Sequence, residues 1–335
     1  MHRSLIPVLA FLLTAHTPAL AALIGGPKTI PLDASGNVPG VVVSAQMGMG
    51  GNIKGATQIV VPLVMVAFES NAKAKTTHSS AGTTTTKSLE SHLVIDEKYL
   101  QAITDQVQGL VEADLVAQGF TVLPHTTVDG EARYAGIAKD GRSGVEVGDN
   151  FMSGFGGNGI KNRWFTAGNR PFFGTGAQGP LSETSALIHL ARESGKTLLF
   201  YRFKIQFTEI DAKNNLFVNY VKGKNVLHMM SADATIYTPA NTLGSMIKLN
   251  ANLTAGTDFI AEVKELPKDK ADEVALNMGA ALQSLLTLSA VTTSSGKASG
   301  HYGIIADPVK YQEGSLALIK VTSRQFAEAI RKAQK

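Results

Sequence analysis

The segment from Thr197 to Ile210 alternates apolar and polar residues almost without a break. Its apolar positions fall on every second residue: Leu199, Tyr201, Phe203, Ile205 and Phe207. A period of two places these side chains on one face of a β-strand and the polar residues between them on the other. The sequence therefore predicts one long, half-buried strand, and the fold must cover a long apolar strip on a sheet.

The residues after this strand predict an antiparallel meander. Asp211 to Asn215 is typical of a turn that leads into a strand at 216–221. Lys222 to Asn225 is typical of a second turn, followed by a strand at 226–237. Further strands are expected at 245–253, 259–266, 302–306 and 316–321.

One buried strand and several helices complete the predicted core. Residues 59–68 are continuously apolar, as in a buried strand, and Pro62 indicates a sheet edge or a bulge there. The clearest helix has Asp96 as its cap and Gly119 at its end. Other helices are expected at 182–195, at 267–288 and from 322 or 323 onward. The pattern predicts an α+β fold with a mixed, largely antiparallel sheet and helices mainly on one face.

Composition divides the chain into four parts. Residues 1–21 precede an extended, Gly- and Pro-rich arm at 22–57, a core domain at 58–295, and C-terminal strands with a helix at 296–335. Two unusual stretches interrupt the core domain. Residues 70–90 are rich in Ser and Thr and fit either a surface loop or a long β-hairpin, while residues 129–180 predict a long Gly-rich loop.

The first 21 residues have the pattern of a secretory signal peptide. Arg3 precedes a short apolar run from Leu5 to Leu13, and the small residues Ala19 and Ala21 predict cleavage after Ala21. We therefore expect a periplasmic, outer-membrane-associated or secreted protein. The chain contains no cysteine, so neither disulfides nor a lipid anchor on cysteine is expected, and direct membrane insertion is not expected either.

Charge and motif patterns predict neither nucleic-acid binding nor catalysis. The 31 basic residues exceed the 27 acidic ones only slightly and do not cluster, unlike a nucleic-acid footprint. The histidines lack metal-binding spacing, and no Gly-x-Ser-x-Gly elbow occurs. The glycine runs at 47–51 and 154–159 lack the Gly-Lys-Ser/Thr ending of a phosphate loop. We expect no catalytic residue, metal or cofactor, and a hydrolase with an unrecognised site is the least favoured function.

The Gly-rich stretch carries large side chains that favour binding. Arginine and aromatic residues are enriched at interface hot spots. The candidate interaction or ligand-binding residues are Arg163, Trp164, Phe165, Arg170, Phe172 and Phe173. The alternative is that the aromatic residues anchor this stretch to the core.

The order of elements from residue 59 onward resembles the periplasmic α/β domain shared by the curli secretion channel family and the TolB amino-terminal domain. The resemblance rests on an apolar strand at 59–68 and a helix that ends in Gly119-Phe120-Thr121-Val122. A second helix and long strand at 182–210, hairpin strands at 216–237 and a helix at 269–288 continue it to about residue 290. The channel members are lipoproteins, whereas this chain has no cysteine. The resemblance implies a non-enzymatic, often oligomeric part of an envelope assembly.

The signal-peptide pattern, the composition and the family resemblance together favour one function. We expect an exported structural or accessory component of a bacterial cell-envelope assembly, oligomeric and acting through contacts with other envelope proteins. The alternative is a periplasmic protein that binds a small ligand or glycan at the 163–173 segment.

Overall fold

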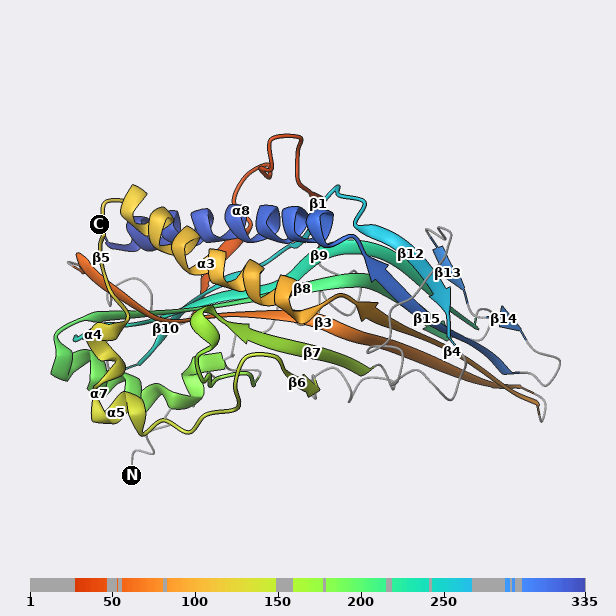
Figure 1. The fold of residues 1–335 in the computed structure, drawn as a ribbon, viewed down its shortest axis with the longest axis horizontal. Helices are drawn as coiled ribbons and strands as arrows, with labels where there is room; N and C mark the ends of the chain where they lie inside the picture. Colours follow the sequence, from red (N-terminus) through yellow and green to blue (C-terminus); the bar gives the residue numbers. More distant parts are fainter. Residues whose placement is uncertain are drawn as a thin grey trace, which may run out of the picture.

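A computed structural model describes residues 28–46, 53, 56–80, 83–148, 159–176, 179–214, 219–240, 243–266, 287–289, 291–292 and 297–334. Within these residues, one curled, mixed β-sheet forms the centre of the fold and helices pack against it (Figure 1). Strands account for more of the structure than helices do. The α+β class predicted from the sequence pattern is therefore confirmed at this level.

The longest path through the sheet has the strand order β1-β11-β9-β8-β3-β4-β15-β12. The bounds of these strands are β1 (Thr29–Pro31), β11 (Asn252–Thr254), β9 (Asn219–Tyr237), β8 (Thr197–Asn214), β3 (Gln58–Ser80), β4 (Thr83–Val94), β15 (Lys297–Ala306) and β12 (Ile260–Glu265). Strands that pair beside this path are β2 (Val43–Gln46), β5 (Thr121–Leu123), β6 (Val145–Gly148), β7 (Gly159–Thr166), β10 (Ser245–Leu249), β13 (Thr287–Ser289) and β14 (Val291–Thr292). Most neighbours are antiparallel, and the parallel pairs are β1 with β11, β3 with β5, β3 with β8, and β4 with β15.

Alternate side chains of β3 enter two separate apolar clusters. Val64 and Val66 belong to one cluster, while Leu63 and Met65 belong to the other, on the opposite face of the sheet. The register between β3 and β8 shifts beside Pro62, as expected for a bulge at this proline. All five apolar residues predicted to share a face of β8 lie in the first cluster, so that prediction is confirmed.

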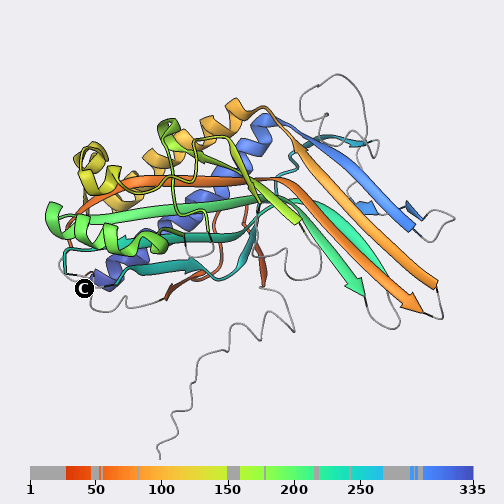
Figure 2. The same ribbon diagram turned by 90° about the horizontal axis from the view of Figure 1, so that it is seen from below.

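Helices cover both faces of this sheet, which corrects the prediction of helices mainly on one face. The helices α3 (Glu97–Ala117) and α8 (Pro308–Gln334) pack side by side over the first cluster. The helices α4 (Thr126–Asp129), α5 (Ala132–Ala135) and α7 (Thr184–Ser194) lie on the other side (Figures 1 and 2). Because the central strand is apolar on both faces, both faces need cover.

The C-terminal helix is longer than predicted, and the strand expected at 316–321 is wrong. The helix α8 begins at Pro308, and Asp307 caps it by accepting hydrogen bonds from the N–H groups of Val309 and Lys310. Buried side chains recur at helical spacing, among them Tyr311, Leu318, Thr322, Phe326 and Ile330. A short apolar run cannot distinguish a strand from a buried helical segment, and here the helical period decides.

Several predicted loops are regular structure. Residues 70–80 and 83–90 lie in β3 and β4, which pair antiparallel, so the β-hairpin interpretation of this stretch is correct. Residues 222–225 lie within β9, paired with β8, so the turn predicted there is wrong. The 129–180 stretch contains α5, β6 and β7, and the described part of the 22–57 arm adds β1 and β2 to the sheet. The glycine-rich composition predicted loops, but hydrogen bonding to neighbouring strands keeps parts of these segments in the sheet.

Two further sequence predictions concern the helix at 267–288 and membrane insertion. The helix predicted at 267–288 lies almost wholly outside the described residues, and residues 287–289 form β13. None of the described helices combines the length and the hydropathy that crossing a lipid bilayer requires.

The α7 helix ends as its sequence predicts. Gly195 adopts a left-handed conformation with φ of 66°, and its N–H binds carbonyl groups of the last helical turn. A Cβ here would meet no atom within 4 Å, so only backbone strain opposes a side chain. We expect Gly195→Ala to lower the free energy of unfolding by about 1 kcal/mol. Gly195→Asn should cost less, because asparagine tolerates this conformation, and urea unfolding of both variants measures the difference.

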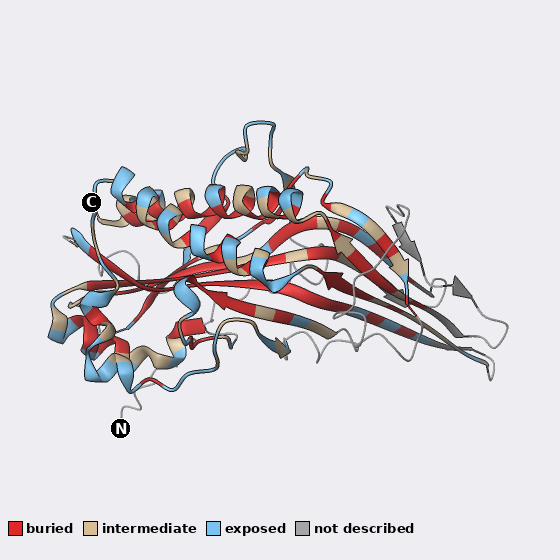
Figure 3. Cartoon of the chain, viewed as in Figure 1, coloured by how far each residue is buried: buried red, intermediate tan, exposed pale blue. Residues whose placement is uncertain are grey.

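The long strands run well past the helices. Figures 1 and 3 show β3, β4, β8, β9 and β15 extending beyond the ends of α3 and α8. The pairing of β3 with β4 continues to Ser80 and Thr83, and that of β8 with β9 to Asn214 and Asn219. The fold is therefore a helix-covered body from which two antiparallel hairpins project.

Candidate functional site

The two hairpins separate at a fork in the sheet. β8 pairs with β3 as far as Phe68, and β4 pairs with β3 from Asn71 onward. β7 pairs with β3 from Met65 to Lys73 and so occupies the opposite edge throughout this region. β8 and β4 therefore use the same edge of β3 in succession, and β8 leaves that edge between Phe68 and Asn71.

Glu69 lies at this fork and compensates for the lost strand pairing. Its Oε2 atom accepts hydrogen bonds from the N–H groups of Phe207 at 3.0 Å and Thr208 at 3.4 Å. These are backbone groups of β8 just beyond its last pair with β3. A carboxyl side chain thus satisfies donors that the departing strand would otherwise leave buried without a partner.

The environment of Glu69 favours the protonated form. The residue is only 1% exposed, and within the described part of the chain no ion pair to it forms. Burial raises the pKa of Glu69 to about 8, although the two backbone N–H donors oppose this by stabilising the carboxylate. A neutral carboxyl group near pH 7 is therefore held inside the fork.

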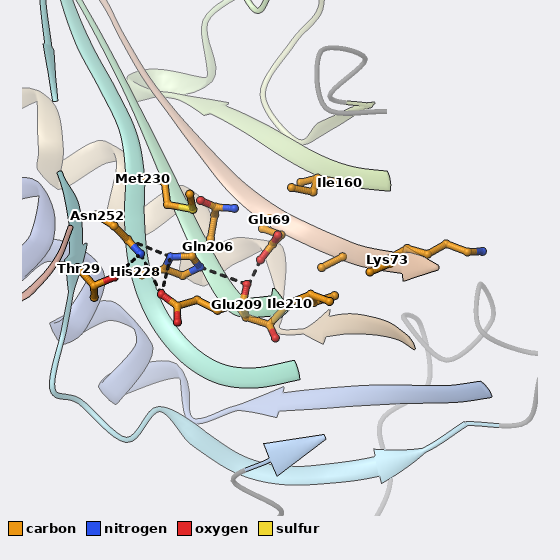
Figure 4. A pocket seen from close by; sticks show the side chains of 13 residues that line it. Thr29, Glu69, Lys73, Ile160, Gln206, Glu209, Ile210, His228, Met230 and Asn252 are labelled. Atoms are coloured by element: carbon orange, nitrogen blue, oxygen red, sulfur yellow. Dashed lines mark hydrogen bonds and ion pairs between the residues drawn. The ribbon is translucent and has the colours of Figure 1, made fainter. Parts of the chain in front are cut away.

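A cavity of about 340 Å³ opens beside Glu69 in the fork (Figure 4). Residues of six strands, β1, β3, β7, β8, β9 and β11, line it. The polar and charged residues are Thr29, Glu69, Lys73, Gln206, Thr208, Glu209, His228 and Asn252. The apolar side chains include Ala72, Ile160, Ile210 and Met230. Its size is in the lower part of the range found for small-molecule sites.

A hydrogen-bonded group forms one wall of the cavity. The Nδ1 atom of His228 lies 3.2 Å from the Oδ1 atom of Asn252, and its Nε2 atom lies 3.2 Å from the carbonyl oxygen of Thr208. The Asn252 amide donates to the Oε1 atom of Glu209 at 2.9 Å. Burial lowers the pKa of His228, while the Glu209 carboxylate, 3.8 Å away, opposes that shift. The wall therefore joins the His228 imidazole, the Asn252 amide and the Glu209 carboxylate in one hydrogen-bonded group.

The aromatic residues predicted for binding are buried within the chain. Trp164 and Phe172 lie in the second cluster, with ring centroids 6.5 Å apart, and Phe173 packs against Phe200. Phe165 faces the other way and contacts Phe68 edge-on. Their positions match the alternative in which they anchor the segment to the core.

The two arginines of that predicted set contact carboxylates at the surface. Arg163 donates to Glu97 at 3.0 Å and lies 3.9 Å from Glu146. Arg170 lies 3.9 Å from Asp129. None of the six residues lines the fork cavity, and an interaction role for this set stays a prediction.

Comparison with protein-family models, with curated proteins and with solved structures gives no match. In the part of the chain that the structure describes, no group of three His, Asp or Glu side chains has the arrangement needed to hold a metal ion. The fork and its cavity are therefore interpreted from their own geometry and charge.

Proposed function

We propose that this chain is an exported structural component of a bacterial cell-envelope assembly and that its copies associate through the projecting hairpins. The observation that carries the proposal is the length of the β3–β4 and β8–β9 hairpins, which continue beyond the helix-covered body (Figure 2). β15 also pairs with β4 from Thr86 to Val94, and β13 pairs with β9 from Lys222 to Lys224, so the hairpins belong to a part of the sheet that extends past the helices. Long paired hairpins outside a helical cover are therefore suited to packing against another protein.

The side chains of the projecting part of β3 support this proposal. Lys73, Lys75 and Thr77 are exposed, whereas Ala74 and Thr76 point inward and are buried. The inward side chains are small, so this part of the hairpin buries little apolar area and gains little stability from its own chain. The signal-peptide pattern at residues 1–21 and the resemblance to envelope domains support the same compartment and class.

Shortening each hairpin tests the proposal. Lys75 pairs with Ser88, and Glu209 pairs with Lys224, so Asn-Gly can replace residues 76–87 or 210–223 as a two-residue turn. The protein without residues 1–21 should form a defined oligomer in size-exclusion chromatography with light scattering. Each shortened variant should elute as a monomer with an unchanged helical circular-dichroism signal.

A surface change outside the hairpins is the control for this experiment. Val116 is exposed on α3, and Val116→Ser should leave the oligomer intact. A monomeric wild-type protein at all concentrations would contradict the proposal. So would shortened variants that keep the oligomer of the wild-type protein.

A further inference from the structure

The fork cavity is lined by two carboxyl groups and by one ammonium group that is paired with a carboxylate outside the cavity. Glu69 and Glu209 are its two carboxyl groups, on β3 and β8. The Lys73 ammonium group, also at the cavity, lies 3.0 Å from the carboxylate of Glu90 and is held by it. Burial lowers the pKa of His228, which disfavours a second positive charge in the cavity wall. The Glu209 carboxylate, joined by that of Glu69 when it ionises, therefore attracts a positive charge from outside the chain.

The rest of the lining selects the kind of cation. Ala72, Ile160, Ile210 and Met230 give the cavity apolar walls, which favour a hydrocarbon stem over a hydrated ion. A metal ion needs several converging ligands, and the described residues provide no such group. An organic cation would suit both features, because Figure 4 shows the Glu69 and Glu209 carboxyl groups and the apolar side chains of Ile160 and Met230 lining the same cavity.

We propose that the fork cavity binds a small primary amine in its ammonium form, with the charged group at Glu69 and Glu209 and the apolar stem against Ile160 and Met230. None of the six candidate residues at 163–173 lines this cavity, and the proposal goes beyond the structural role proposed for the hairpins. Because Glu69 also holds the first backbone N–H groups of the separated β8, a bound ammonium contacts the residue that maintains the fork.

Binding requires Glu69 to lose its proton. In the free protein the carboxyl group is neutral up to about pH 8 because it is fully buried. An ammonium ion at hydrogen-bond distance stabilises the carboxylate, so the proton of Glu69 leaves to solvent as the ion pair forms. The charged and titratable groups around Glu69 are Lys73 on β3, Glu209 on β8, His228 on β9 and Tyr311 on α8. Uptake should therefore release close to one proton per ligand near pH 6.5 and almost none well above pH 8.

Calorimetric titration with 2-phenylethylammonium tests this proposal on the protein without residues 1–21. Titrations at pH 6.5 in two buffers of different ionisation enthalpy should show the release of about one proton. Glu69→Gln should weaken binding on the order of tenfold, because it removes the ion pair and keeps the side-chain shape. The neutral 2-phenylethanol should bind more weakly than the amine by a similar factor.

Glu209→Gln and Glu131→Gln complete the design. The first variant should weaken binding severalfold, whereas Glu131, exposed and outside the cavity, should be without effect. Absence of amine binding to the wild-type protein would overturn the proposal. Equal affinity for the amine and the alcohol, or wild-type affinity in Glu69→Gln, would also overturn it. The oligomer measured by light scattering is a separate readout, so failure here leaves the hairpin proposal to its own test.

Discussion

Replacing Arg202 with methionine should destabilise the protein by about 3 to 5 kcal/mol. Arg202 on β8 lies opposite Asp233 on β9, and both side chains are almost fully buried, with 5% and 2% exposed. The Nε and Nη2 atoms of Arg202 lie 2.9 Å and 2.8 Å from Oδ2 of Asp233. Removal of the guanidinium would leave the Asp233 carboxylate buried without a positive partner. An unpaired buried charge of this kind is strongly destabilising.

The same guanidinium also holds the segment before α7 in place. Its Nη1 atom donates to the carbonyl oxygens of Gly174 at 2.9 Å and Gly176 at 2.6 Å. Gly179 packs so closely that a Cβ on it would lie 2.8 Å from the Cζ atom of Arg202. Arg202→Lys should therefore restore only part of the stability, because a single ammonium cannot contact the carboxylate and both carbonyl groups with the same planar geometry.

The double variant Arg202→Met, Asp233→Leu distinguishes an ion-pair effect from a packing effect. Because it removes both buried charges, it should recover most of the stability that Arg202→Met alone loses. Urea unfolding of the wild-type protein, the two single variants and the double variant gives the coupling energy. Additive losses in the double variant would show that the charges do not depend on each other.

The features predicted correctly are those that depend on local pattern. The alternation in β8 and the apolar run at the start of β3 are fixed by which faces are buried, so the sequence shows them directly. The first helix has Asp96 as its N-cap, with its side chain accepting from the N–H of Lys98, and Gly119 follows its end with φ of 83°. Such caps depend on neighbouring residues alone and can be read from the sequence.

The features that were missed depend on partners distant in the sequence. Residues 222–225 resemble a turn, but pairing with β8 keeps them in β9. Thr76 and Ala74 gave no strong strand signal, yet β4 holds them in the β3–β4 hairpin. One local signal was overlooked, since Asp307 followed by Pro308 is a favourable start for a helix and would have placed α8 correctly.

The candidate site also depends on residues that are distant in the sequence. Glu69 follows an unbroken apolar run, and a carboxyl at the end of such a strand was the available sign of an unusual position. Glu209, His228 and Asn252 come together only through the register of β8, β9 and β11, which no short motif encodes. The aromatic residues from 164 to 173 were conspicuous in sequence because they are large, and burial inside the chain accounts for their size.

Glu69→Gln should make the protein more stable at alkaline pH and leave its stability almost unchanged near pH 4.5. In the wild-type protein, burial raises the pKa of Glu69 from its ordinary value of 4.5 to about 8. Between these values the unfolded chain loses the proton while the folded chain keeps it, so wild-type stability falls as the pH rises through this window. Above about pH 8 both states are ionised, and the loss is complete.

The size of this effect follows from the difference in pKa. Each unit corresponds to about 1.4 kcal/mol, so the wild-type protein should lose roughly 4 to 5 kcal/mol of stability from this residue between pH 4.5 and pH 8. Glutamine is neutral at every pH and retains an oxygen that can accept from the N–H groups of Phe207 and Thr208. The variant should therefore be more stable than the wild-type protein by that amount above pH 8.

Urea unfolding of both proteins at intervals from pH 4.5 to pH 9 measures this difference directly. Comparison of the two proteins cancels the titration of every other group that they share, including His228 on the cavity wall. Glu131→Gln, a change of the same kind at an exposed position, should shift stability by less than about 0.5 kcal/mol at every pH. If Glu69→Gln tracks the wild-type curve across the whole range, then the folded protein ionises Glu69 at an ordinary pH and the fork does not isolate it from water. If it rises above that curve only as the pH increases, then the folded protein keeps the proton on Glu69 through this pH range.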